Sequence, residues 1–410
     1  MDYKEAFIEL LRGAVCGEMK IVPEFCNVKW EKILYLAQIT GTLTLLCEQV
    51  KNVNESYAIP EDIYNKFVYT TIHLALKEEK KIMYLEKILL EARNQGIEVI
   101  VFKGPVVADA YSDYRLRVSS DTDMYVDDIN KEKMIHILEK LGYTWLRESS
   151  KLKVQNFTIL NEHYVELHTA LWEDYSGTKI DTLQSMNLTT CENRINDIFC
   201  GIDITTLKYE KHLIFLLFHF AKHMIIETAN IRFIVDILLF FVKHQEEMNI
   251  KELQNDLEKI GYWDFFNIIC NIGVMCLGMD ADLFPFIINL DQKSIKYVLS
   301  TLIDQSIKYK KEKEKWQMVH YMMPYFTGDN EKGKKDGKRK IQYLFPNREQ
   351  LPEKYSYAKK HVILLPLAWG LRMLNYIFER LDTRKYRMSG LKRMNKIDDK
   401  LEILRKFKLV

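Results

Sequence analysis

The sequence predicts an α+β protein in which a small mixed sheet is surrounded by a larger, mainly α-helical shell. Apolar residues recur at helical spacing over residues 1–95 and again after residue 206, whereas residues 96–206 contain short β-branched runs separated by turns. A helix repeats every 3.6 residues and a strand every 2, so the two patterns can be told apart. The order of the patterns along the chain therefore gives the fold class.

The same patterns indicate how the chain divides. A length of 410 residues is enough for two or three domains that each bury a core. We expect an N-terminal helical region, a core that holds the strands and the candidate site, a helical domain, a mobile linker rich in Gly, Lys and Asp, and a helical, basic C-terminal region. Their expected bounds are 1–95, 96–206, 207–326, 327–340 and 341–410.

The first elements lead from helix into strand. Trp30–Val50 and Glu78–Arg93 have apolar residues at helical spacing, and each is expected to form a helix. The turn sequence Asn94-Gln95-Gly96 follows the second helix. The β-branched run Glu98–Phe102 then predicts a buried strand.

The sequence Lys103-Gly104-Pro105 follows that strand and is expected to open a helix. Glycine permits a sharp turn and a close approach of the backbone to a ligand, and proline fits the first helical position. The free N–H groups of the helix start, with Lys103 beside them, predict a corner that binds phosphate. Arg115 and Arg117 could add phosphate contacts. The alternative is an ordinary strand–turn–helix with a lysine on its surface.

Two aspartates stand one residue apart in Ser120-Asp121-Thr122-Asp123, directly before an apolar run. Alternate side chains of a strand project from the same face, about 6.5 Å apart along the backbone. Asp121 and Asp123 could therefore chelate one hard cation, and Mg²⁺ usually takes one or two protein carboxylates together with substrate phosphates. The alternative is a pair of solvated aspartates in a turn.

A third carboxylate is expected from a neighbouring strand. Lys153–Leu160 and His163–His168 alternate in polarity around Asn161-Glu162, which predicts a hairpin. Glu166 stands among apolar residues, where a charge is costly unless it is paired or bound to metal. Adjacent strands lie about 4.8 Å apart, so Glu166 could join the two aspartates, with His168 on the same face. The alternative is that Glu166 pairs with a nearby lysine or arginine.

Together these residues resemble the nucleotidyltransferases of the DNA polymerase β-like superfamily, and most closely a bacterial group described as uncharacterised nucleotidyltransferases. The resemblance implies that Gly104 is the turn glycine. It also implies that Asp121, Asp123 and Glu166 bind two Mg²⁺ ions. One departure is that the turn reads Lys-Gly-Pro, whereas Gly-Gly or Gly-Ser is commoner in the superfamily.

The resemblance extends over most of the chain. Further segments that resemble the group are Trp30–Leu46, Leu138–Tyr143, Leu213–Phe241, Leu344–Pro346 and Leu364–Trp369. The long segment Leu213–Phe241 reads as one or two helices. It carries His219, Lys222, His223, Arg232 and Asp236, which resemble the group's histidine-containing helix and its Arg-x-x-x-Asp motif.

His219 and His223 are four residues apart, a spacing that can bind zinc on a helix face. The residues between them do not include the glutamate that a zinc protease uses as its base. We therefore expect these histidines to border the active-site cleft or to form buried hydrogen bonds.

Composition limits the partners and the compartment. The net charge of +2 gives no overall signature of nucleic-acid binding, and the basic segments Lys332–Lys340 and Arg380–Lys408 are expected to be solvated, with RNA contact as the less favoured alternative. Seven scattered cysteines indicate reduced thiols. The first residues are charged and no apolar run reaches about 18 residues, so we expect a cytoplasmic protein without a transmembrane segment.

The leading hypothesis is a metal-dependent nucleotidyltransferase that moves an NMP from an NTP to an unidentified acceptor hydroxyl or amine. Two Mg²⁺ ions, or Mn²⁺ in their place, are the expected cofactors. We expect Asp121, Asp123 and Glu166 to be catalytic metal ligands. The residues expected to contact the nucleotide are Lys103, Gly104, Arg117, Ser120, His168 and His223. Two alternatives stay open, namely a non-catalytic nucleotide-binding or scaffold protein that kept the fold, and an RNA-modifying nucleotidyltransferase.

Overall fold

The computed structural model describes residues 1–17, 19, 23–57, 59–146, 154–172, 180–226, 229–311, 345, 351, 355–371 and 390–409. The chain forms two compact units. The first contains residues 1–173, 181–220 and 229–307, and the second contains residues 174–180, 221–228 and 308–410. The expected linker at 327–340 and the basic run Lys332–Lys340 lie outside the described residues.

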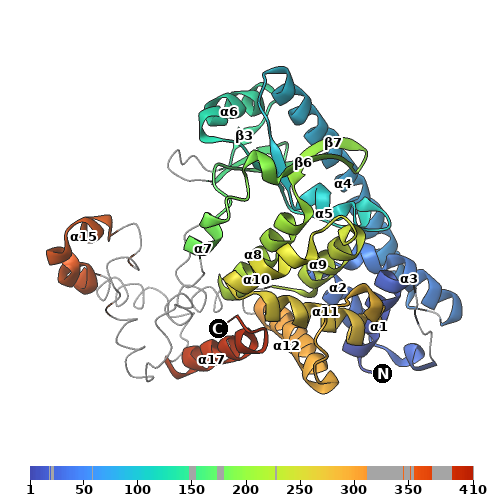
Figure 1. Ribbon diagram of the computed structural model, residues 1–410. Helices are drawn as coiled ribbons and strands as arrows, with labels where there is room; N and C mark the ends of the chain where they lie inside the picture. The colour runs from blue at the N-terminus through green and yellow to red at the C-terminus, as the bar shows by residue number, and fades with distance from the viewer. Residues whose placement is uncertain are drawn as a thin grey trace. The chain divides into compact units, whose positions relative to one another are not determined.

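The first unit contains one seven-stranded mixed sheet, and the chain is otherwise mostly helical, which confirms the predicted α+β class (Figure 1). The strand order is β3-β4-β5-β2-β1-β7-β6. Strand β1 pairs antiparallel with β2 and parallel with β7, and β2 pairs parallel with β5. The strands are β1 (Ile100–Phe102), β2 (Thr122–Tyr125), β3 (Thr144–Trp145), β4 (Val154–Ile159), β5 (His163–His168), β6 (Arg194–Phe199) and β7 (Ile202–Leu207).

The strands at the centre of the sheet form where the sequence predicts them. All three residues of β1 are buried, as expected for a short β-branched run covered on both faces. The predicted hairpin is also present, because β4 and β5 pair antiparallel from Ile159 and His163 onward. Its turn places Leu160 and Asn161 at φ values of 52° and 56°. Positive φ at adjacent residues suits the right-handed twist of the strands that a hairpin joins.

The N-terminal helices differ from the prediction at one point. Trp30–Val50 was expected to form a single helix, but it is divided into α2 (Trp30–Thr40) and α3 (Leu43–Ser56). Gly41 ends α2 in the left-handed region at φ 67°, where glycine has no steric penalty. The spacing of apolar residues could not reveal this break, because the same spacing continues from α2 into α3. The other helices here are α1 (Tyr3–Cys16) and α4 (Glu61–Asn94).

Helix α4 is 34 residues long and includes the predicted helix Glu78–Arg93. Figure 1 shows it extending from the sheet toward the N-terminal helices. Two short elements connect the central strands, namely α5 (Gly104–Ala108) after β1 and the 3-10 helix η2 (Tyr114–Leu116) before β2. Helix α6 (Lys131–Lys140) lies between β2 and β3 in the chain, with the 3-10 helix η3 (Asp128–Asn130) before it, and packs against α4.

The helices that follow the sheet carry much of the core. They are α8 (Tyr209–Ile226), α9 (Ile231–His244), α10 (Ile250–Ile260), α11 (Trp263–Leu277) and α12 (Gln292–Lys311). Several of their phenylalanines are fully buried. They include Phe220, Phe240, Phe241, Phe265 and Phe266. Short elements complete the described part of the first unit, namely η1 (Pro23–Asn27), α7 (Ile180–Ser185), η4 (Cys191–Asn193) and η5 (Ala281–Leu283).

The described part of the second unit has a small core of its own. Leu351, Tyr355, Ala358 and Ala368 are buried together, and Trp369 packs against them. The helices described here are α15 (Ser356–Lys360), η10 (Val362–Leu364) and α17 (Gly390–Lys406). The basic segment Arg380–Lys408 is described only from residue 390 onward.

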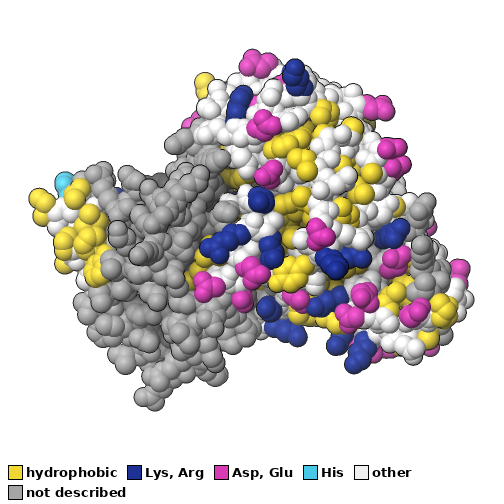
Figure 2. All heavy atoms as spheres, turned by 60° about the horizontal axis from the view of Figure 1, so that its bottom comes forward, with side chains coloured by type: hydrophobic (Ala, Val, Ile, Leu, Met, Phe, Trp, Pro, Cys, Tyr) yellow, Lys and Arg dark blue, Asp and Glu magenta, His cyan; other side chains and the backbone are white. Residues whose placement is uncertain are grey.

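Within the described residues, no single helix is both long enough and apolar enough to cross a membrane. Helices α10 and α11 satisfy the length and composition only as a pair bent by 120°. Figure 2 shows acidic, basic and apolar side chains interspersed on the face that it views. This mixture agrees with the net charge of +2.

Candidate active site

Two neighbouring strands bring the candidate ligands together. Asp123 on β2 is the direct register partner of Glu166 on the parallel strand β5, and of Phe102 on β1. Residues in register on adjacent strands lie about 5 Å apart and share a face of the sheet. Both carboxylates therefore project from the same face, and His168 follows Glu166 two residues later on that face.

The ligand atoms of Asp123, Glu166 and His168 all lie within 4.8 Å of one another. His168 Nε2 is 3.2 Å from Asp123 Oδ1 and 3.6 Å from Glu166 Oε2. The two carboxylates differ in exposure, because the Asp123 side chain is 2 % exposed and that of Glu166 is 33 % exposed. Asp123 is thus the buried acid of the pair, and Glu166 is the acid that solvent or a ligand can reach.

Asp121 immediately precedes β2 and stands outside this group of ligand atoms, but it shares the electrostatic field of the group. Burial raises the pKa of Asp121, and the negative charges of Asp123 and Glu166 raise it further. Ser120 Oγ donates a hydrogen bond of 3.0 Å to Asp121 Oδ1. Three acids thus concentrate negative charge at one end of β2 and β5, where a divalent cation would relieve their repulsion.

Lys103 supplies the positive charge opposite these acids. Its Nζ lies 2.7 Å from Asp123 Oδ1, and its side chain is 13 % exposed. Burial alone would raise the pKa of Asp123, but Lys103 and His168 together hold that pKa well below its usual range. The pKa of His168 is raised in turn, because its contacts with Asp123 and Glu166 outweigh the effect of burial. Asp123 is therefore a firmly ionised carboxylate.

The sharp turn expected at Gly104 occurs one residue earlier. Lys103 has a φ of 57° and a ψ of −123°, a backbone conformation that favours glycine. A Cβ added to Gly104 would meet only the Asp121 carbonyl oxygen, at 3.9 Å. The backbone conformation of Lys103 costs about 1–3 kcal/mol for a residue with a side chain. The backbone of the turn is therefore strained at Lys103.

His212, at the start of α8, holds the strained turn in place. The Lys103 backbone N–H donates a hydrogen bond of 3.0 Å to His212 Nε2, and His212 Nδ1 lies 3.3 Å from Thr206 Oγ1. His212 is fully buried, and burial lowers its pKa to about 3. A neutral imidazole with an acceptor at Nε2 carries its proton on Nδ1, which fits both contacts. Sequence reasoning missed this residue.

Removing the His212 acceptor should loosen the turn. We expect His212→Leu to lower the free energy of unfolding by about 1–3 kcal/mol, because the buried Lys103 N–H loses its partner. His212→Gln should cost less, because its amide oxygen can accept the same hydrogen bond. Urea unfolding of the two variants checks this. Equal losses for leucine and glutamine would show that the hydrogen bond contributes little.

Arg117 is held in a buried network beneath the turn. Its Nε lies 2.8 Å from Asp236 Oδ1 and its Nη2 lies 2.9 Å from Asp236 Oδ2, while Nη1 donates to the Gly104 carbonyl oxygen at 3.2 Å. Tyr111 donates a hydrogen bond of 2.6 Å to Asp236 Oδ1. The Arg117 side chain is 6 % exposed. These contacts brace the turn, and the expected role of Arg117 as a phosphate ligand stays a prediction.

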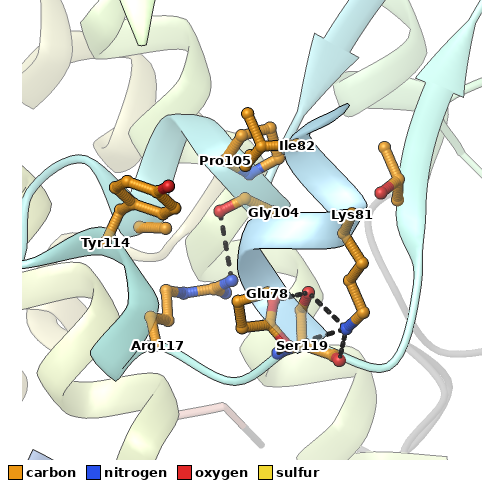
Figure 3. A pocket seen from close by; sticks show the side chains of 10 residues that line it. Glu78, Lys81, Ile82, Gly104, Pro105, Tyr114, Arg117 and Ser119 are labelled. Carbon is orange, nitrogen blue, oxygen red and sulfur yellow. Dashed lines mark hydrogen bonds and ion pairs between the residues drawn. The ribbon is translucent and has the colours of Figure 1, made fainter. Parts of the chain in front are cut away.

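A small pocket of about 10 Å³ lies behind the turn, large enough for about one water molecule (Figure 3). Glu78 and Lys81 of α4 enter it, with Lys81 Nζ 2.7 Å from Glu78 Oε1. The loop before Asp121 contacts both, because Ser119 N and Oγ each donate to Glu78 at 3.2 Å and the Ser119 carbonyl accepts from Lys81. These contacts fix the loop that leads into β2.

Two further predicted residues, His219 and His223, lie on α8. His219 packs its ring against Phe215 and Phe233, with centroids 6.3 Å and 5.5 Å away. His223 belongs to the second unit, so its expected contact with nucleotide stays a prediction. The residues that sequence reasoning did not single out are Glu78, Lys81, Tyr111, Ser119 and His212. A partial signal existed for Glu78 and Lys81, because they occupy positions on the apolar face of α4.

Two buried histidines should make the fold sensitive to acid. Burial lowers the pKa of both His163 and His212 to about 3. Between about pH 6.5, where the unfolded chain binds these protons, and pH 3, the unfolded state holds more protons than the folded state. Stability should therefore be present above pH 6.5 and be lost as the pH falls. We expect His163→Gln to reduce the proton uptake on unfolding by up to about one, as measured from urea unfolding between pH 7 and pH 5.

A family model described as uncharacterised nucleotidyltransferase matches residues 27–272, which is more than half of the chain. Among solved structures, the solution structure of the antibiotic-resistance factor ANT(2″)-Ia is similar to 44 % of this chain and 92 % of its own, with 13 % identity and a TM-score of 0.33. That score is too low to carry any detail across. No curated protein matches the sequence. The match over residues 27–272 confirms the predicted family, and the chain belongs to the uncharacterised nucleotidyltransferases.

Proposed function

We propose that this protein transfers a nucleoside monophosphate from an NTP to an acceptor hydroxyl or amine, with divalent cations bound at Asp123 and Glu166. The observation that carries the proposal is the register of these two acids on the parallel strands β2 and β5, opposite the Lys103 turn. Membership of the nucleotidyltransferase family gives the class of reaction. The site geometry suggests which residues perform it.

The donor atoms suit a divalent cation. Two carboxylates and one imidazole nitrogen within 4.8 Å of one another offer hard oxygen ligands together with a nitrogen. Mg²⁺ prefers oxygen ligands, and an imidazole is accepted more readily by Mn²⁺ and later transition metals. Asp121 adds a third acid, whose pKa is raised by burial and further by the negative charges of Asp123 and Glu166. We therefore propose Asp121, Asp123 and Glu166 as ligands and expect Mn²⁺ to be accepted as well as Mg²⁺.

We assign proton transfer and stabilisation of the leaving group to two side chains of the site. Glu166 is the more exposed carboxylate of the pair, so we assign it to receive the proton of the acceptor group. Lys103 carries a positive charge at the strand end, where it can offset negative charge that develops on the leaving pyrophosphate. When bound, the cations would bridge the triphosphate and lower the pKa of the acceptor hydroxyl.

A second candidate function is nucleotide binding without turnover. The observation that favours it is the ion pair between Lys103 Nζ and Asp123 Oδ1, because an ammonium group already neutralises the anchoring carboxylate. In that case the protein should bind an NTP with little dependence on divalent cations. The strained lysine turn would then have replaced the glycine turn along with the loss of catalysis.

Transfer and binding can be separated in one set of assays. The purified full chain is incubated with each NTP labelled at the α-phosphate, with Mg²⁺ or Mn²⁺ and cell extract. We expect label to appear on one component of the extract and to be lost on addition of a chelator. Metal-independent binding of a non-hydrolysable NTP without labelling would support the second candidate. Absence of both binding and labelling would contradict both.

A further inference from the structure

The solvent face of α4 carries an apolar stripe with a repeat of seven residues. Tyr69, Leu76, Met83 and Leu90 are 70 %, 56 %, 55 % and 57 % exposed, and Ile72 beside them is 52 % exposed. From Tyr69 to Leu90 the stripe covers about 31 Å of helix, or three heptads. Single exposed apolar residues are common, but a set that shares one face of a helix is a candidate interaction surface.

The stripe is separate from the core of the first unit. The buried residues of α4 include Phe67, Lys81, Leu85 and Ile88, which lie on the opposite side of the helix. At 100° per residue, Leu76 and Met83 point away from the centre of that buried face by roughly 180°. The stripe therefore adds nothing to the packing of α4 against the sheet.

Charged residues border the stripe with opposite signs on its two sides. Glu79 and Glu86 follow the apolar positions by three residues, and Lys80 and Lys87 follow them by four. All four are exposed. Residues at i+3 and i+4 fall on opposite sides of the row, which gives the stripe an acidic edge and a basic edge. Lys80 is also 3.3 Å from Glu162 and remains 58 % exposed.

We propose that α4 binds α4 of a second copy of this chain, with the two helices parallel about a two-fold axis that runs along them. In this arrangement the acidic edge of each helix meets the basic edge of the other, so Glu79 lies beside Lys80 and Glu86 beside Lys87 across the contact. An antiparallel pair would place Glu79 beside Glu79 of the second copy and Lys80 beside Lys80, so that like charges would meet. The arrangement of charges therefore favours a second copy of the chain as the partner, with its α4 parallel to that of the first.

Parallel pairing also makes each apolar layer symmetric. Leu76 faces Leu76 and Met83 faces Met83 of the second copy, as the residues at equivalent heptad positions do in a parallel coiled coil. An apolar repeat of seven residues, kept over three heptads, favours a left-handed crossing of the two helices. This association does not depend on the proposed catalytic activity.

Sedimentation equilibrium of the full chain over a range of concentrations tests the association. We expect a mass of about twice 48.7 kDa that falls to the single-chain value in the double variant L76E/M83E. Ile129→Glu and Ile198→Glu are matched controls, because both side chains are exposed and lie outside α4, and they should leave the dimer intact. A wild-type chain that is monomeric at every concentration would overturn the proposal, as would equal dissociation by the controls.

The direction of pairing has its own test. Met83→Cys should form a disulfide-linked dimer on mild oxidation, above the background of the wild-type chain with its exposed Cys26 and Cys191. A mixture of Leu76→Cys and Met83→Cys chains should give no additional mixed product. Preferential linking of Leu76→Cys to Met83→Cys would show antiparallel pairing and would overturn the proposed arrangement.

Discussion

Replacement of Asp123 by asparagine should lower nucleotidyl transfer by at least about 10³-fold while the protein still folds. Asp123 is the most buried acid of the site and is in contact with both Lys103 and His168. Asparagine keeps the size of the side chain but removes the charge that would hold a cation against the triphosphate. The measurement is transfer of α-phosphate label under saturating NTP and Mn²⁺, with circular dichroism to confirm the fold.

Asp127→Asn is the matched control. Asp127 lies two residues beyond the end of the same strand, but its side chain is 51 % exposed, and Arg194 Nη2 lies 3.8 Å from its Oδ1. This control should keep transfer close to the wild-type rate. Retained transfer in the Asp123 variant would remove the catalytic assignment, whatever the control shows. Direct Mn²⁺ binding, followed by electron paramagnetic resonance, should be lost in the same variant.

The Asp123 variant should also change the response to acid. Burial alone would raise the pKa of this carboxyl, yet Lys103 and His168 hold it well below its usual range. An acid with a depressed pKa stabilises the fold above its unfolded pKa, and this stabilisation is lost as the pH falls toward the folded value. Asparagine has no such dependence, so the stability of the variant should fall less steeply below about pH 4.

The sequence predicted the strands of the site well because their signals are local. The run Glu98–Phe102, the alternating hairpin and the Asp-x-Asp segment each contain their own pattern, and the structure places them as β1, β4–β5 and β2. Strand spacing predicted only that Glu166 could lie near the two aspartates, and the structure places it in register with Asp123. The metal ligands themselves remain predictions until binding is measured.

The parts that the sequence did not predict depend on contacts between distant segments. The hydrogen bond of His212 to the Lys103 backbone joins residues 109 positions apart, and the pair of Arg117 with Asp236 joins residues 119 positions apart. Arg117 was expected at the phosphate because it lies just before the aspartates and an arginine can form bidentate contacts with phosphate. Its position beneath the turn became visible only once α9 was placed against α5.

The turn itself shows why a motif is less informative than a backbone. The glycine of Lys103-Gly104-Pro105 attracted attention, but the left-handed conformation belongs to Lys103. A side chain is tolerated there because the Lys103 N–H is bonded to His212 and its ammonium to Asp123. Strain of this kind persists where the surroundings over-determine the conformation, and it is commonly found at functional sites.

The pair of Arg117 and Asp236 should be the most sensitive point of the fold. We expect Arg117→Leu to lower the free energy of unfolding by about 3–5 kcal/mol, because it leaves the Asp236 carboxylate buried without its bidentate partner. Burial alone would raise the pKa of Asp236, and Arg117 is the main group that lowers it. The leucine variant should therefore raise that pKa, and its loss of stability should shrink as the pH falls and the buried carboxyl takes up a proton.

Arg115→Leu, two residues earlier on η2, provides the matched control. Arg115 also forms a close pair, with Nη2 2.7 Å from Asp113 Oδ2, but both side chains are exposed to solvent. Exposed pairs contribute about 0–1 kcal/mol, so this variant should unfold at nearly the wild-type urea concentration. The double variant R117L/D236L should recover most of the loss, because it removes the unpaired charge. Similar losses of unfolding free energy for the Arg115 and Arg117 variants would show that burial does not govern the strength of these pairs. The pair of Arg117 and Asp236 would then not be what stabilises the turn.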